Sequence, residues 1–177
     1  MPAYPVLHGP RVTLRPVRED DAPALHALLT EPAVARWWHE WDEARVRRDL
    51  IEQDEEHVNV IEVGGEIAGL LLVYEEPDEY KHAALDVSLG TAHQGQGLGP
   101  EALRLVITYL IEERGHHRLT IDPAASNERA IRAYSRVGFR PVGVMRNYER
   151  ARDRTWHDGV LMDLLAGELS EPDKRNS

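Results

Sequence analysis

Hydrophobic and polar residues alternate over short runs of this chain, and longer runs with helical spacing separate them. Alternation is typical of half-buried strands, because successive side chains point to opposite faces of a sheet. Repeats at three and four residues are typical of amphipathic helices. We expect strands over residues 11–17, 57–63, 66–76, 81–90, 118–122, 139–145 and 159–165. We expect helices over residues 19–34, 41–56, 100–114 and 127–138.

The order of these elements predicts one mixed α/β unit (α+β), in which helices flank a mainly antiparallel central sheet. Gly64 and Gly65 join two apolar runs, a pattern typical of a tight hairpin. No linker or internal repeat divides the chain. We therefore expect a single domain over residues 1–169, followed by a flexible tail over 170–177.

The composition excludes several classes of function. The chain of 177 residues has no cysteine and a formal net charge of -10. The lack of cysteine rules out disulfides and a thiol nucleophile, and it suits a cytoplasmic protein. The acidic balance argues against nucleic acid, which attracts a basic face. The N-terminus lacks the pattern of a signal peptide, and no apolar run reaches the roughly 20 residues of a membrane span, so we expect no membrane contact.

Residues 93–100, His-Gln-Gly-Gln-Gly-Leu-Gly-Pro, place three glycines and a proline before a long helical pattern. A glycine-rich turn exposes backbone N–H groups, and a helix N-terminus adds positive partial charge; together they bind anions such as phosphate. Pro100 suits the first helical position, where a missing N–H costs little. The spacing matches neither the dinucleotide fingerprint nor a P-loop. By itself, the stretch fits an anion site and a purely structural turn about equally well.

The surrounding segment adds two patterns. Residues 94–99 read Gln-x-x-Gly-x-Gly, and Asn127 is followed by Tyr134 and then by Gly-Phe at 138–139. In both patterns the chain resembles the GCN5-related N-acetyltransferase (GNAT) superfamily, whose acyl-CoA signature is Gln/Arg-x-x-Gly-x-Gly/Ala. The opening at residues 11–25 is also similar, so the resemblance covers nearly the whole chain.

The resemblance implies a GNAT fold with acetyl-CoA (coenzyme A) in a cleft between splayed central strands. The pyrophosphate would lie against the amides of residues 95–99, where a Cβ would block it. A backbone N–H near residues 87–89 would stabilise the oxyanion. The positions implied for coenzyme A are Val87, Ser88, Leu89, Gln94, Gly95, Gln96, Gly97, Leu98, Gly99, Asn127 and Tyr134.

Within the superfamily, three stretches are similar to the aminoglycoside 6'-N-acetyltransferases. They are the Trp-Trp element at 34–41, the Leu-Asp strand at 85–90 and the Thr-Ile-Asp-Pro run at 120–134. The loop at 74–84 departs from that group, because it is shorter and has no tryptophan. The resemblance implies acetylation of the 6'-amino group by direct transfer, without a covalent enzyme intermediate, and antibiotic resistance as the outcome.

Other functions also fit the sequence. An N-terminal alanine acetyltransferase of the ribosomal-protein type shares the opening at 14–22. A siderophore hydroxylysine acyltransferase and an inactive acyl-CoA-binding module are further alternatives. Both a monomer and a homodimer are compatible with the chain.

The chemistry of amine acylation selects three side chains. A primary amine has a pKa of about 10.4, so its deprotonation at neutral pH costs roughly 4–5 kcal/mol, and a base must accept the proton. Asp86 and Asp122 lie on or at the ends of strands beside the expected cofactor. We expect Asp86 to be the base, in contact with the substrate, and Asp122 to hold a cationic amine, although an Asp before Pro is also common in turns. The resemblance assigns Tyr134 to protonation of the departing thiolate.

Aromatic and acidic residues suggest where a cationic acceptor binds. Trp37, Trp38 and Trp41 lie around a turn between two expected helices. Packing of this turn onto the core accounts for at least one of the three, and Trp37 and Trp38 could form a wall against sugar rings. The loop at 75–79 is acidic, and we assign Glu76 and Asp78 to the substrate. The nine histidines show no zinc-like spacing, so we expect no metal site.

Overall fold

The computed structural model of the chain describes residues 4–38, 40–53, 57–76, 79–150 and 154–171. Eight strands form one sheet in the order β1-β2-β3-β4-β5-β6-β8-β7. All neighbouring strands are antiparallel except β5 and β6, which run parallel. The strands are β1 Leu7–His8, β2 Thr13–Pro16, β3 His57–Val63, β4 Glu66–Glu75, β5 His82–Leu89, β6 Arg118–Ile121, β7 Arg140–Arg150 and β8 Trp156–Leu165. The mixed, mainly antiparallel sheet confirms the predicted fold class.

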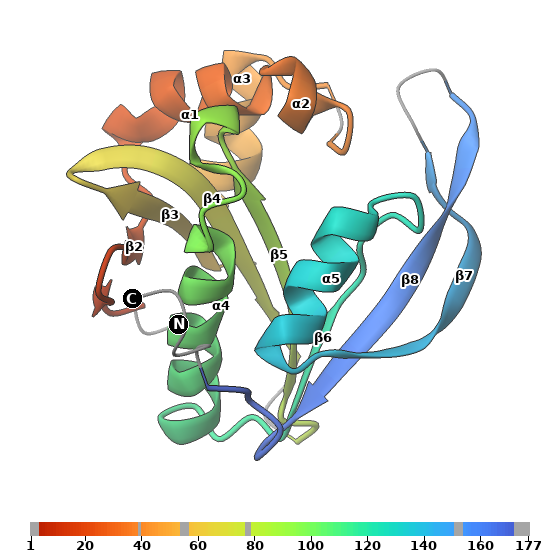
Figure 1. The fold of residues 1–177 in the computed structure, drawn as a ribbon. Helices are drawn as coiled ribbons and strands as arrows, with labels where there is room; N and C mark the ends of the chain where they lie inside the picture. Colours follow the sequence, from red (N-terminus) through yellow and green to blue (C-terminus); the bar gives the residue numbers. More distant parts are fainter. Residues whose placement is uncertain (1–3, 39, 54–56, 77–78, 151–153, 172–177) are drawn as a thin grey trace.

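The helices lie on both faces of this sheet (Figure 1). They are α1 Ala22–Leu29, α2 Pro32–Ala35, α3 Glu43–Val46, α4 Leu98–Glu112 and α5 Glu128–Val137. Short 3-10 turns span Glu19–Asp21 (η1) and Thr91–His93 (η3), and a π-helical turn (η2) spans Arg47–Ile51.

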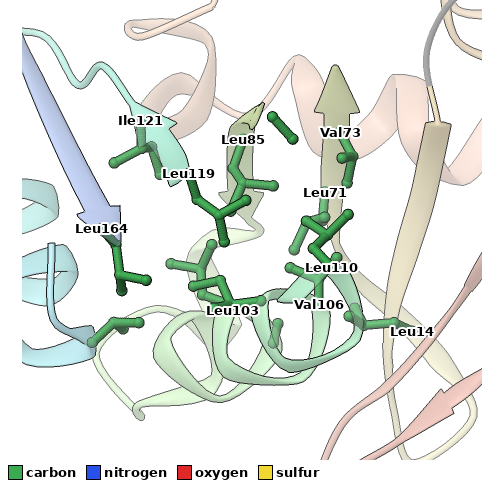
Figure 2. Packing of buried hydrophobic residues seen from close by; sticks show 14 of the residues in the cluster. Leu14, Leu71, Val73, Leu85, Leu103, Val106, Leu110, Leu119, Ile121 and Leu164 are labelled. Carbon is green, nitrogen blue, oxygen red and sulfur yellow. The ribbon is translucent and has the colours of Figure 1, made fainter. Parts of the chain in front are cut away.

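The apolar run of β4 explains why helices cover both faces of the sheet. Leu71 and Val73 belong to the hydrophobic cluster under α4, where Leu103, Val106 and Leu110 face the strands (Figure 2). Leu70 and Leu72 belong to a second cluster with residues of α1 and α3. Because alternate side chains of a strand point to opposite faces, β4 is buried on both sides and reads as a continuous apolar run.

The predicted hairpin at Gly64-Gly65 is present, with both glycines at positive φ, 61° and 85°. The predicted helix over 19–34 was wrong in its extent. Glu31 has an extended backbone, with φ -57° and ψ 131°, and it separates α1 from α2. The ring of Pro32 disfavours a helical conformation for the residue before it, and this accounts for the break.

Two other boundaries also differ from the prediction. The helix expected over 41–56 is reduced to α3 and η2, and residues 54–56 lie outside the described residues. The last two strands extend well past 139–145 and 159–165, because β7 reaches Arg150 and β8 starts at Trp156. β7 is an edge strand and is mostly exposed. Its residues after Met145 therefore lack the alternation that a half-buried strand shows.

A buried ion pair attaches the start of α1 to β2. The Arg15 guanidinium donates to both carboxylate oxygens of Asp21, at 2.7 and 2.9 Å, and also donates to Glu62 at 2.7 Å. Burial alone would raise the pKa of Asp21, but hydrogen bonds from Arg15 and from the backbone N–H of Arg18 outweigh it and lower the pKa. The pair therefore favours the folded state whenever Asp21 is ionised.

We expect Asp21→Asn to lower the free energy of unfolding by about 3 kcal/mol near neutral pH, because it leaves a buried guanidinium with one partner fewer. The lowered pKa means that this contribution is complete above the unfolded value of about 3.9 and is lost as the pH falls through the folded value. Urea denaturation over this pH range measures it, with the exposed neighbour Asp20→Asn as control. An equal loss in both variants, or a loss independent of pH, would contradict the assignment.

Candidate active site

The central strands part after a short paired stretch. β5 and β6 pair only through His82–Ala84 and Arg118–Thr120. Beyond Ala84, β5 continues to Leu89 and stays paired with β4, whereas β6 ends and the chain turns away (Figure 1). The edge of β5 near residues 87–89 therefore faces an opening in the sheet.

A cavity of about 370 Å³ lies at this opening. Its walls come from the end of β5, the glycine turn with the start of α4, one face of α5, and the segment from α2 to Trp38. Val87, Ser88 and Leu89 all line it. Gly69 lets β4 pair closely with this part of β5, because a Cβ at Gly69 would clash with the carbonyl oxygen of Ser88.

The glycine turn has the backbone of an anion site. Gly95 and Gly97 have φ of 76° and 78°, in the left-handed region that glycine adopts without strain. Within the described residues, no carbonyl accepts the N–H groups of residues 95–99. The helix begins at Leu98, two residues earlier than predicted, and Pro100 occupies its third position, where an N–H is also not needed. The turn thus presents N–H groups and the positive end of α4 to the cavity.

Side chains from distant segments brace this turn. Gln94 donates to the Leu89 carbonyl at 2.7 Å and accepts from Arg129 at 2.5 Å. Arg11 donates to the Gln96 carbonyl at 2.9 Å and pairs with Glu101 at 2.8 Å. Gln96 itself donates to the carbonyl of Ala92, at 2.7 Å. The turn is therefore held in place by contacts within the protein.

Three arginines of α5 line the cavity, and our sequence analysis did not identify them. They are Arg129, Arg132 and Arg136. Their spacing of three and four residues places them on one helix face, and this periodicity was the available signal. In a chain with a net charge of -10, a basic wall opposite the glycine turn suits a ligand that carries several phosphates. The residues present therefore fit coenzyme A.

Asn127 and Tyr134 also line the cavity, on α5. Asn127 caps the helix, because its side chain accepts a hydrogen bond from the backbone N–H of Ala130 at 3.3 Å. The ring of Tyr134 packs edge-on against Phe139, with centroids 6.4 Å apart. Both residues thus have a structural part in α5 as well as a place in the cavity.

Asp86 and Asp122 lie close enough to Tyr134 for their charges to act on it, although neither residue is among those that line the cavity. Burial raises the pKa of Tyr134, and the negative charges of Asp86 and Asp122 raise it further, whereas Arg129 acts in the opposite direction. The phenol is therefore protonated throughout the neutral range and is a proton donor. Asp86 lies in β5, and Asp122 follows the end of β6, so the two carboxylates come from the two strands that part.

The tryptophans divide between the cavity and the core. Trp37 and Trp38 line the cavity. Trp38 and Trp41 also pack against the cluster under α1, and their ring centroids are 6.4 Å apart. Arg36 stacks on Trp37 at 4.6 Å. Packing thus accounts for Trp41, while Trp37 and Trp38 remain available to a ligand.

The described residues at the start of the acidic loop, Glu75 and Glu76, are not near this cavity. Glu75 pairs in register with Ala83, six residues and about 20 Å along β5 from Leu89. Its carboxylate is buried among Tyr4, Arg114 and His116, with hydrogen bonds of 2.6 to 3.2 Å. Glu76 lies next to it and is exposed, and Asp78 lies outside the described residues. The structure therefore does not bring Glu76 to the other predicted substrate residues.

Two negative findings concern the described part of the chain. None of its helices has the length and apolarity that crossing a membrane requires. Its His, Asp and Glu side chains form no group of three or more that could hold a metal ion.

The comparisons with known proteins agree with this geometry. The family described as "Acetyltransferase (GNAT) domain" matches residues 11–140, which is more than half of the chain. The protein belongs to this family. Its fold and family therefore define it as an acetyltransferase, as the resemblance predicted.

Each of the individual relatives described here is less than 30% identical to this chain. Spermidine N(1)-acetyltransferase of Escherichia coli (strain K12) is 29% identical over 140 residues, which cover 75% of this chain and 74% of the relative. Aminoglycoside N(6')-acetyltransferase type 1 of Klebsiella pneumoniae is 28% identical over 153 residues, 76% of each chain. The structure of spermidine N-acetyltransferase from Vibrio cholerae in complex with CoA and spermine has a TM-score of 0.78 and 19% identity, and covers 90% of this chain and 98% of that one.

We expect Gly97→Ala to raise the KM for acetyl-CoA about tenfold, because a Cβ at this left-handed position costs about 1–2 kcal/mol and distorts the turn. Gly99→Ala is the matched control. Gly99 has no positive φ, a Cβ there would meet Leu89 at an ordinary 3.4 Å, and the superfamily signature admits alanine. Steady-state kinetics measures both variants. A tenfold effect confined to Gly99→Ala would refute this account of the turn.

Proposed function

We propose that the protein transfers the acetyl group of acetyl-CoA to a primary amine of a cationic small molecule, specifically the 6'-amino group of an aminoglycoside. The observation that carries the proposal is the grouping of Asp86, Asp122 and Tyr134 at the point where β5 and β6 part. Membership of the GNAT family supports acetyl-CoA as the donor. The turn at 95–99 and the arginines of α5 are the groups that would hold it.

The reaction needs a base, an oxyanion donor and an acid. The neutral amine attacks the thioester carbonyl carbon, so that a C–N bond forms and the C–S bond breaks. Asp86 accepts the proton of the amine, directly or through water. A backbone N–H of residues 87–89 stabilises the oxyanion, and the Tyr134 hydroxyl protonates the departing thiolate. Burial and both aspartates raise the pKa of Tyr134, so its hydroxyl carries the proton before transfer.

The acceptor is expected to be a cation because the carboxylates of Asp86 and Asp122 act on Tyr134, which lines the cavity. Asp122 would pair with an ammonium of the substrate, and Trp37 and Trp38 offer flat surfaces to sugar rings. The similarity to the aminoglycoside acetyltransferase supports this class. The similarity to spermidine N(1)-acetyltransferase makes a linear polyamine the second candidate, which would use the carboxylates but not the aromatic wall.

We expect the purified protein to consume acetyl-CoA with aminoglycosides that carry a 6'-amino group and to spare those with a 6'-hydroxyl. Thiol release measures turnover, and NMR of the product identifies the acetylated nitrogen. A susceptible bacterium expressing the gene should show the same pattern of resistance. Spermidine and a peptide with an N-terminal alanine are the competing substrates. Preference for either one, without acetylation of any aminoglycoside, would overturn the assignment.

We expect Asp86→Asn and Tyr134→Phe each to lower kcat at least 100-fold, because proton transfer contributes about 10²–10⁴ to rate. The KM for acetyl-CoA should change little. Asp163→Asn is the matched control, since its carboxylate lies on β8 and pairs with Arg118 at 3.1 Å. Near wild-type turnover of either active-site variant would remove that residue from the mechanism.

A further inference from the structure

The β7–β8 hairpin is bulged beside Asp122. Met145 pairs with Gly159 and Glu149 with His157, so three residues of β7 lie opposite a single residue of β8. Within the bulge, Asn147 adopts a φ of 51°, and its N–H donates to the Asp158 carboxylate at 2.8 Å. Bulges of this kind change the direction in which a side chain points and are common beside active sites.

Gly159 provides the space that the bulge requires. A Cβ at Gly159 would lie 2.9 Å from Cδ1 of Tyr148 and 3.3 Å from Cε of Met145. The ring of Tyr148 therefore lies against the backbone of β8. The same part of β8 is fixed to the segment after Asp122, because the N–H of Val160 donates to the Pro123 carbonyl at 2.9 Å and the N–H of Ala125 to the Asp158 carbonyl at 2.8 Å.

The result is a contact between the hairpin and the site. The Tyr148 hydroxyl hydrogen-bonds to the Asp122 carboxylate. This bond, then burial and the charges of Asp122, Glu149 and Asp86, raises the pKa of Tyr148 to about 12. Burial and the charge of Asp122 also raise the pKa of Glu149. Asp122 therefore lies close to Glu149, and the Tyr148 hydroxyl is a hydrogen-bond donor to its carboxylate.

We infer that Tyr148 is a positioning residue for the acceptor: its hydroxyl holds one oxygen of Asp122 and leaves the other to face the substrate ammonium. This inference rests on the proposed function and deepens it, because it assigns part of substrate recognition to the β7–β8 hairpin. Tyr148 itself is 48% exposed, which places its ring at the rim of the site. The hairpin thereby becomes an element on which acceptor specificity depends.

Tyr148→Phe tests the inference, because it keeps the ring against Gly159 and removes only the hydroxyl. We expect the KM for the cationic acceptor to rise five- to tenfold, with kcat and the KM for acetyl-CoA within twofold of wild type. Tyr80→Phe, an exposed tyrosine on another loop, is the matched control.

A double-mutant cycle separates positioning from a merely structural role. In an Asp122→Asn background, Tyr148→Phe should change the acceptor KM by less than twofold, because Tyr148 acts through Asp122. An unchanged acceptor KM in the single variant, or a full effect in the Asp122→Asn background, would overturn the inference. If the wild-type protein acetylates no cationic amine, the proposed function fails instead, and the two failures are distinct.

Discussion

The separation of β5 from β6 after Ala84 is the constraint on which the site depends. Three pairs of residues hold these parallel strands together. β6 then ends, and the β7–β8 hairpin, which pairs with β6 and not with β5, continues the sheet. Buried backbone groups need hydrogen-bond partners. The edge of β5 at residues 87–89 is therefore suited to a ligand that supplies what a neighbouring strand would otherwise supply.

Charge divides the opening into two halves. The glycine turn, the N-terminus of α4 and the arginines of α5 favour an anion on one side. Asp86, Asp122 and Glu149 instead lie near Tyr148, and the charges of all three raise its pKa. A protein with a net charge of -10 thus keeps a local basic wall, which suits an anionic ligand.

Rigidity at the turn comes from parts of the chain that are far away in sequence. Glu31 accepts hydrogen bonds from the backbone N–H and the hydroxyl of Thr91, at 2.6 and 2.5 Å, and so ties α2 to the start of the turn. Arg11 and Glu101 tie the segment before β2 to α4. A site that is ordered before the ligand arrives loses less entropy on binding. The N-terminal segment therefore helps to fix the glycine turn without lining the cavity.

The sequence by itself determined the features that depend on local pattern. Apolar runs located β3 and β4, alternation located β5, Gly64-Gly65 located the β3–β4 hairpin, and the motif at residues 94–99 located the turn. Each of these signals depends on neighbouring residues alone. The tertiary structure decided the rest. Glu75 follows an apolar strand and looks like part of an acidic loop, yet strand pairing buries it with Arg114, far from the turn. Tyr148 has no motif, and only the register of β7 against β8, two residues out of step around Asn147, turns it toward Asp122. Register and burial depend on residues that are distant in the chain, so no local pattern carries them.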